Sequence, residues 1–161
     1  MAMAKVPNSL IGAAGVHFVV SELSLRGVVA IPTVRNTAGV DVLVFDPETV
    51  CHAGLQVKTS GKIKPVSFWP TSLPEHCLRG DSIYYVFVRY DAARDNSGCS
   101  CAHPSGFEAF LDDSDRVVRQ IARNIRNQKK SGRKKLFPCW YLPKAETEQA
   151  ELARRWSCWR P

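Results

Sequence analysis

Two short runs of apolar and β-branched residues, 40–46 and 54–58, constrain the fold of this chain more than any other feature. Their length, and the turn-forming segment that begins between them at Pro47, predict an antiparallel β-hairpin. Residues two apart on a strand point to the same face of a sheet, so Gln56 and Lys58 share one face. A register that sets Asp41 beside them would bring together a carboxylate, an amide oxygen and an ammonium group, which is a combination suited to a metal site.

The segments around the hairpin alternate between extended and helical patterns. Strand patterns occur at 28–32, 83–90 and 107–111, and a last short one occurs at 136–141. Helical patterns occur at 12–26, 112–130 and 144–159, and a brief helix is expected within 71–78. The first helix has an apolar stripe formed by Val16, Val19, Val20 and Leu23, and Gly27 is its stop signal. The run 83–90 is almost continuously apolar, which is typical of a central strand.

This order of elements predicts a mixed β-sheet covered by helices on both faces, in the α/β or α+β class. The 161 residues fit one domain, and we expect a single unit over 1–161 with a basic helical C-terminal part over about 112–161. The first residues lack the apolar run of a secretory signal, and no stretch reaches the ~18 apolar residues of a membrane span. We therefore expect a cytoplasmic protein with no membrane partner, whose six cysteines are reduced.

The positive charge of the chain lies in its last third. From Arg116 onward there are 13 Lys and Arg against 3 Asp and Glu, whereas the first 115 residues hold 9 against 12. The helical period of 112–130 gathers the basic residues on one side, which predicts a surface that follows a nucleic-acid backbone. A solvated amphipathic helix accounts for the same pattern. The residues that we expect to contact nucleic acid are Arg119, Arg123, Arg126 and Lys130, together with Lys62 and Lys64 in a polar loop after the hairpin.

The order of a helix, a strand, an Asp-bearing strand and a Gln-x-Lys strand resembles the PD-(D/E)XK nuclease superfamily, which has the restriction-endonuclease-like fold. The resemblance covers about residues 11–90, roughly half of the chain. In that family the aspartate that begins the second strand and the acidic or amide residue of the third bind Mg²⁺. The lysine two residues later stabilises the attacking water or the charge that develops on phosphorus.

Carried over to this chain, the resemblance implies that Asp41 and Gln56 are ligands of Mg²⁺ or Mn²⁺ and that Lys58 is the catalytic cation. It implies a DNA endonuclease that hydrolyses phosphodiester bonds, and a homodimer, because cutting two strands needs two sites. The chemistry agrees with these residue types. Mg²⁺ prefers hard oxygen ligands, and a nearby ammonium group adds positive charge where the transition state needs it.

One position departs from the family pattern. Many relatives have a glutamate directly after the glycine that corresponds to Gly15, and here that residue is Val16. Glu22, the only acid of the first helix, and His17 are the candidates to assist the site, with a solvated acid and a structural histidine as their ordinary roles. The alternatives to an active nuclease are an inactive member that binds nucleic acid or serves in assembly, and an unrelated α/β interaction protein whose hairpin only mimics the motif.

Two further groups have the composition of sites. Cys99, Cys101 and His103 offer three soft ligands, and Cys139 or Cys158 would supply a fourth for zinc. Because their spacing is not that of a zinc knuckle, a loop with free thiols is the preferred interpretation. Three tryptophans near the C-terminus are expected to be core or interface anchors: Trp140, Trp156 and Trp159.

Overall fold

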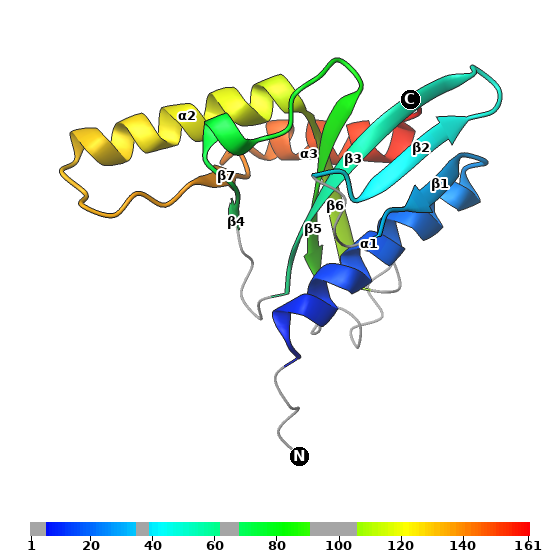
Figure 1. The fold of residues 1–161 in the computed structure, drawn as a ribbon, viewed down its shortest axis with the longest axis horizontal. Coiled ribbons are helices and arrows are strands. Elements are labelled where there is room, and N and C mark those ends of the chain that lie inside the picture. The colour runs from blue at the N-terminus through cyan, green and yellow to red at the C-terminus, as the bar shows by residue number, and fades with distance from the viewer. Residues whose placement is uncertain (1–5, 35–38, 62–67, 91–105) are drawn as a thin grey trace.

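The computed structural model describes residues 6–34, 39–61, 68–90 and 106–161, which form a mixed β-sheet and three α-helices (Figure 1). The main sheet has five strands in the order β1-β2-β3-β5-β6. They are β1 (Val29–Pro32), β2 (Val42–Asp46), β3 (Cys51–Ser60), β5 (Ile83–Tyr90) and β6 (Phe107–Asp113). Neighbouring strands are antiparallel except β3 and β5, which are parallel. A mixed α/β architecture is therefore confirmed.

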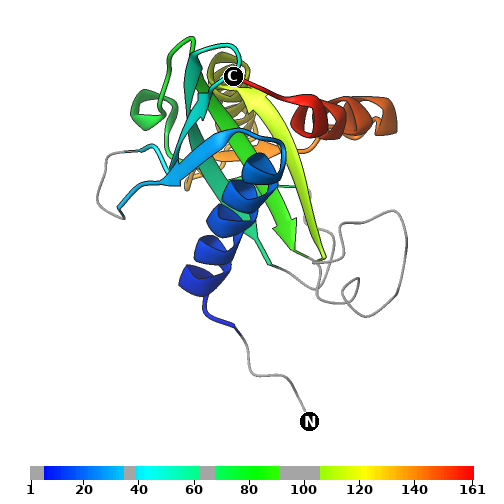
Figure 2. The ribbon, with the colours of Figure 1, turned by 90° about the vertical axis from the view of Figure 1, so that its right-hand side faces the viewer.

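The helix α1 (Asn8–Leu25) covers one face of this sheet (Figure 2). Val19 and Leu23 are fully buried against Val42 and Leu55, while Val16 and Val20 are partly buried against the same cluster. The predicted apolar stripe is thus confirmed. The chain leaves the helix through Gly27, whose φ of +80° lies in the left-handed region that favours glycine.

The opposite face is covered by α2 (Ser114–Lys130) and by a small sheet of β4 (Phe68–Pro70) and β7 (Cys139–Tyr141). Alternation along β5 shows that the two layers are on opposite faces, since Val86 and Val88 belong to the first cluster and Tyr85 and Phe87 to the second. The ring of Phe87 stacks on Trp140 with centroids 3.9 Å apart.

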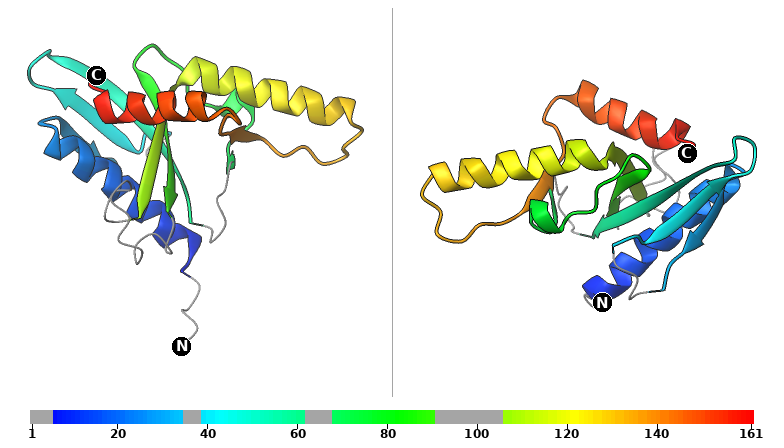
Figure 3. Two further views of the ribbon diagram at one scale, coloured as in Figure 1. Left: turned by 180° about the vertical axis from the view of Figure 1, so that it is seen from behind. Right: turned by 45° about the horizontal axis from the view of Figure 1, so that its top comes forward.

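The helix α3 (Glu146–Cys158) packs against the edge strand β6 and crosses it near the end that leads into α2 (Figure 3). Its Leu152 and Trp156 are buried, and Trp159 after the helix meets the ring of Tyr84 edge to face at 5.2 Å. The tryptophans at the C-terminus therefore serve as anchors of the core, as predicted. A helix packed against part of an edge strand also hinders its pairing with another chain.

Several predicted boundaries needed correction. The first helix begins at Asn8 rather than at residue 12, and the helix predicted within 71–78 is one 3₁₀ turn, η1 (Pro74–His76). The Gln-x-Lys strand is longer than 54–58, because β2 pairs back to Cys51 and β5 pairs on to Ser60. The strand predicted at 136–141 is shortened to β7, because the side chain of Gln128 bonds both backbone groups of Phe137.

Some predicted residues lie outside the described segments, namely Lys62, Lys64, Cys99, Cys101 and His103. The four described cysteines (Cys51, Cys77, Cys139 and Cys158) are all unpaired. Across the described segments, no helix has the length and apolar character that crossing a membrane requires.

Candidate metal centre beside strand β3

Asp41 is held against β3 by both its backbone and its side chain. Its N–H donates to the carbonyl of Leu55 at 2.8 Å, and its Oδ2 accepts from the N–H of Val57 at 2.7 Å. The regular ladder of β2 and β3 begins one residue later, with Val42 opposite Leu55. The carboxylate therefore takes the place of a strand partner for Val57, which fixes its position at the end of β2.

Gln56 and Lys58 flank the N–H group that binds this carboxylate. Their neighbours on β5 in the sheet are Tyr85 and Phe87, so both side chains lie on the face that α2 covers. Leu55 and Val57 point to the opposite face, toward α1. The predicted placement of Asp41 beside the Gln-x-Lys segment agrees with this register.

The electrostatic surroundings of Asp41 favour a cation. Burial raises the pKa of the Asp41 carboxyl above its usual value. The hydrogen bond from Val57 and the charge of Lys58 lower that pKa, but the effect of burial is larger. Within the described residues, the other carboxylate oxygen, Oδ1, accepts no hydrogen bond. A half-buried carboxylate with an available oxygen is suited to a hard metal ion such as Mg²⁺.

The residues present fit a weakly bound ion better than a closed metal cage. In the part of the chain that the structure describes, no three His, Cys, Asp or Glu side chains gather to hold a metal. A metal here would therefore be bound by Asp41, the amide oxygen of Gln56 and water. Mg²⁺ sites of this kind, with one carboxylate and several waters, are common at phosphate-processing centres.

Two residues that the sequence did not single out lie beside the Gln-x-Lys segment, Tyr85 opposite Gln56 and Cys77 within reach of the charge of Lys58. Cys77 follows η1, and burial raises the pKa of its thiol although Tyr85 and Lys58 act in the opposite direction. The Tyr85 hydroxyl donates to the carbonyl of Leu78 at 3.3 Å, and burial raises its pKa. The segment after η1 thus borders the site on the side of Lys58. Only the position of Tyr85 opposite Gln56 could have indicated this, and that pairing is not readable from sequence.

The candidates on α1 have other surroundings. Gly15 lies close against β3, where an added Cβ would be 1.9 Å from Oγ1 of Thr59. His17 is exposed and lies about 200° around the helix axis from Gly15, so it faces away from β3. Glu22 forms an ion pair with Arg26 at 3.1 Å, and Arg26 donates to the carbonyl of Trp156. Glu22 therefore joins α1 to α3, and a catalytic role for either residue stays a prediction.

The basic face of α2 forms as the helical period predicted. Val117, Val118, Ile121 and Ile125 are buried. The charged residues on the outside are all exposed, namely Arg116, Arg119, Arg123, Arg126 and Lys130. The helix begins with Asp113 as its N-cap, which accepts the N–H of Arg116 at 2.8 Å. Because α2 covers the face that carries Gln56 and Lys58, the basic helix and the candidate metal centre belong to the same side of the sheet.

Comparisons of this chain with protein-family models, with curated proteins and with solved structures found no match.

Proposed function

We propose that this protein is a metal-dependent DNA endonuclease of the restriction-endonuclease-like type, which hydrolyses phosphodiester bonds at Asp41, Gln56 and Lys58. The observation that supports the proposal is the bond from the Val57 N–H to Asp41 at 2.7 Å, because it fixes a carboxylate between the strand positions of Gln56 and Lys58.

In this proposal each residue has a distinct task. Asp41 and the amide oxygen of Gln56 hold Mg²⁺ or Mn²⁺, which when bound lowers the pKa of a water molecule and offsets phosphate charge. Lys58 places an ammonium group beside the same carboxylate, where it stabilises the negative charge that develops on the phosphoryl oxygens. Gln56 carries no charge, so the ion is held more weakly than it would be between two carboxylates.

The positive charge of α2 supports the proposal that the substrate is a polyanion. Its exposed arginines and Lys130 lie on the side of the sheet that carries the candidate metal centre. A row of cations of this kind binds a nucleic-acid backbone regardless of base sequence, and its affinity falls steeply with salt. Homodimerisation, which cleavage of two strands calls for, is part of the same proposal.

A second function is favoured by one observation on α1. Val16, at the position where many nucleases of this type have a glutamate, packs partly buried against the apolar cluster. That position therefore supplies packing in place of an acid. A nuclease-like fold that binds nucleic acid without cleaving it, or that serves in assembly, is the alternative.

Plasmid cleavage with Mg²⁺ or Mn²⁺ separates the two functions. We expect wild-type protein to nick or cut the plasmid, EDTA to stop it, and Lys58→Ala to lower the rate at least 100-fold. Lys144→Ala removes an exposed lysine after β7 and is the matched control, which should retain the wild-type rate. Equal cleavage by the Lys58 variant would overturn the site. Salt-sensitive DNA binding with no cleavage under any metal would favour the alternative.

A further inference from the structure

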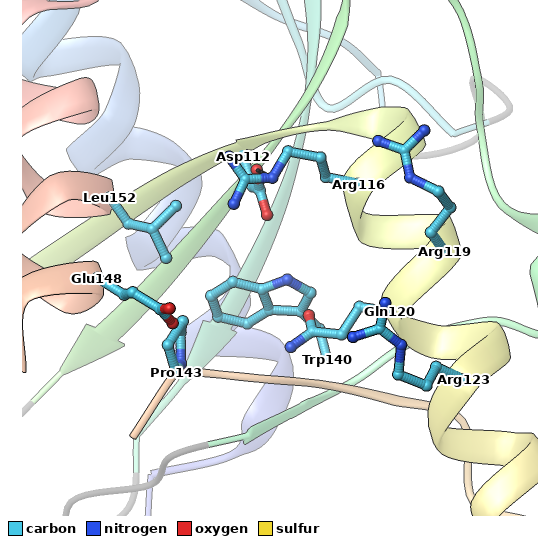
Figure 4. A pocket seen from close by; sticks show the side chains of 9 residues that line it. All are labelled: Asp112, Arg116, Arg119, Gln120, Arg123, Trp140, Pro143, Glu148 and Leu152. Carbon is cyan, nitrogen blue, oxygen red and sulfur yellow. Dashed lines mark ion pairs between the residues drawn. The ribbon is translucent and has the colours of Figure 1, made fainter. Parts of the chain in front are cut away.

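A pocket of about 400 Å³ lies between α2, β7 and the first half of α3, apart from the candidate metal centre (Figure 4). One wall is the basic side of α2 with Arg116, Arg119 and Arg123, and Trp140 forms part of the lining. Glu148 on α3 lies across from the arginines. The volume suits a small ligand of the size of a phosphate group with part of a nucleotide.

The arginines of this pocket differ in whether they have an ion-pair or hydrogen-bond partner within the described residues. Arg116 forms an ion pair with the buried carboxylate of Asp112 at 3.3 Å, and Arg155 approaches the same carboxylate at 3.8 Å. In contrast, Arg119 and Arg123 form no ion pair or hydrogen bond with any described residue. Arg116 and Arg155 are thus engaged by Asp112, whereas the guanidinium groups of Arg119 and Arg123 are left to supply donors for an anion from outside.

A second and independent observation points to a ligand. The indole Nε1 of Trp140 is buried and has no hydrogen-bond acceptor, and the residue is 1% exposed. Figure 4 shows the edge of the ring that carries this nitrogen turned toward Asp112 and Arg116. A buried donor without an acceptor is unfavourable in a native structure. An oxygen-rich ligand in the pocket would supply the missing acceptor.

We propose that this pocket binds a terminal phosphate, that is, a phosphate monoester at the end of a nucleic-acid strand. A phosphate monoester has close to two negative charges and three acceptor oxygens, which matches two unpaired guanidinium groups and one buried donor. A carboxylate has one negative charge and would leave one of the two guanidinium charges unmatched. The Nε1–H of Trp140 is buried, so the phosphate at the end of a nucleic-acid strand can reach it, whereas a phosphate within a continuous backbone cannot.

The position of the pocket relates it to the candidate metal centre. Gln56, Tyr85 and Asp112 lie opposite one another on β3, β5 and β6, in one row across the same face of the sheet. Neighbouring strands are about 4.8 Å apart, so the backbones of Gln56 and Asp112 are separated by about 10 Å. A strand end held at Arg119 and Arg123 would therefore run across the face that carries Lys58. The pocket can bind a phosphate group whether or not the protein cleaves DNA. The inference that the phosphate belongs to a nucleic-acid strand rests on the proposed function.

The test compares three otherwise identical labelled oligonucleotide duplexes in EDTA: one with a 5′-phosphate, one with a 3′-phosphate and one with hydroxyl groups at both ends. We expect the wild type and Lys58→Ala to bind one phosphorylated duplex about tenfold more tightly than the hydroxyl form. The double variant Arg119→Gln, Arg123→Gln should bind all three alike. Arg126→Gln removes a charge from the same helix outside the pocket, and it should weaken all three while retaining the preference. Glu148→Gln should strengthen the preference about twofold.

Competition identifies the source of the phosphate group. Displacement of the phosphorylated duplex by a nucleoside 5′-monophosphate or by inorganic phosphate, lost in the double variant, supports the pocket and shows that it accepts free phosphates. Displacement only by phosphorylated oligonucleotides supports the pocket as a reader of strand ends. Absence of any preference in the wild type, or a preference that survives the double variant, would overturn the proposal. A phosphate preference without cleavage would retain this pocket and overturn the proposed function, and cleavage without a preference would do the opposite.

Discussion

Two aspartates bound the strand β2, Asp41 directly before it and Asp46 as its last residue, and they are used in different ways. Asp46 is fully buried at the turn into β3, where its Oδ1 accepts the N–H of Glu48 at 2.9 Å. Arg160, near the C-terminus, lies 3.8 Å from its Oδ2, pairs with Glu48 and donates to the carbonyl of Arg26. Asp41, five residues earlier, is half-buried and has Lys58 as its described cationic neighbour.

The comparison separates a structural carboxylate from a candidate functional one. Asp46 joins the β2–β3 turn, the end of α1 and the C-terminal residues, so its interactions lie within the protein. Each carboxylate has one oxygen bonded to the backbone and one that accepts no hydrogen bond from a described residue. The second oxygen of Asp46 is buried 3.8 Å from the Arg160 guanidinium, whereas Asp41 forms no ion pair with a described residue. Burial raises its pKa in spite of Lys58, so the protein alone leaves its charge incompletely compensated. Incomplete compensation of this kind is what a bound cation would complete.

The sharpest way to break this comparison is to neutralise each aspartate in turn. Asp41→Asn should lower the cleavage rate at least 100-fold, because the amide can still accept the Val57 N–H but no longer offers a charged metal ligand. Asp46→Asn is the matched control at the other end of the same strand, and it should cleave within about threefold of wild type. Equal losses in both variants would show that the effect comes from the strand and not from Asp41.

The next effect concerns stability and reverses the roles of the two residues. Asp46→Ala removes the acceptor for the Glu48 N–H and leaves Arg160 without one of its carboxylates. Loss of such a buried partner costs about 1–3 kcal/mol, which for a domain of this size lowers Tm by about 3–10 °C. Thermal unfolding followed by circular dichroism measures it. The companion variant Asp46→Asn retains the acceptor, so it should lose less than half as much, and an unchanged Tm in Asp46→Ala would contradict a structural role.

The sequence predicts one of these aspartates better than the other, for a physical reason. Asp41 and the Gln-x-Lys segment belong to one hairpin, so strand alternation and a short turn are enough to place them together. The importance of Asp46 depends on Arg160, at the far end of the chain, and no local pattern links the two. The same limit explains Tyr85 and Cys77, which reach the surroundings of Lys58 only through the pairing of β5 with β3 and the path of η1.

The helices show the same division. The basic face of α2 follows from the 3.6-residue period and was predicted correctly, and so was the apolar stripe of α1. The pocket at Arg119 and Arg123 needs α3 and β7 to pack beside α2, and sequence periodicity contains no information on that arrangement. Local periodicity therefore predicts which side of an element is charged or apolar, whereas sites built between distant elements require the structure.

The smallest effect distinguishes the two aspartates by their response to pH and metal. The pKa of Asp41 is raised in the folded state, so the native protein binds a proton there more tightly than the unfolded protein does. Wild type therefore loses stability as the pH rises from the ordinary Asp pKa to the raised value. Without metal at neutral pH, Asp41→Asn should therefore have a Tm about 1–3 °C above wild type. The difference should vanish when the pH falls below that interval, where the wild-type carboxyl is protonated. Saturating Mg²⁺ should reverse the order, because an ion that binds the native carboxylate stabilises wild type alone. If Asp41→Asn is less stable than wild type in EDTA, Asp41 belongs with Asp46 as a structural residue.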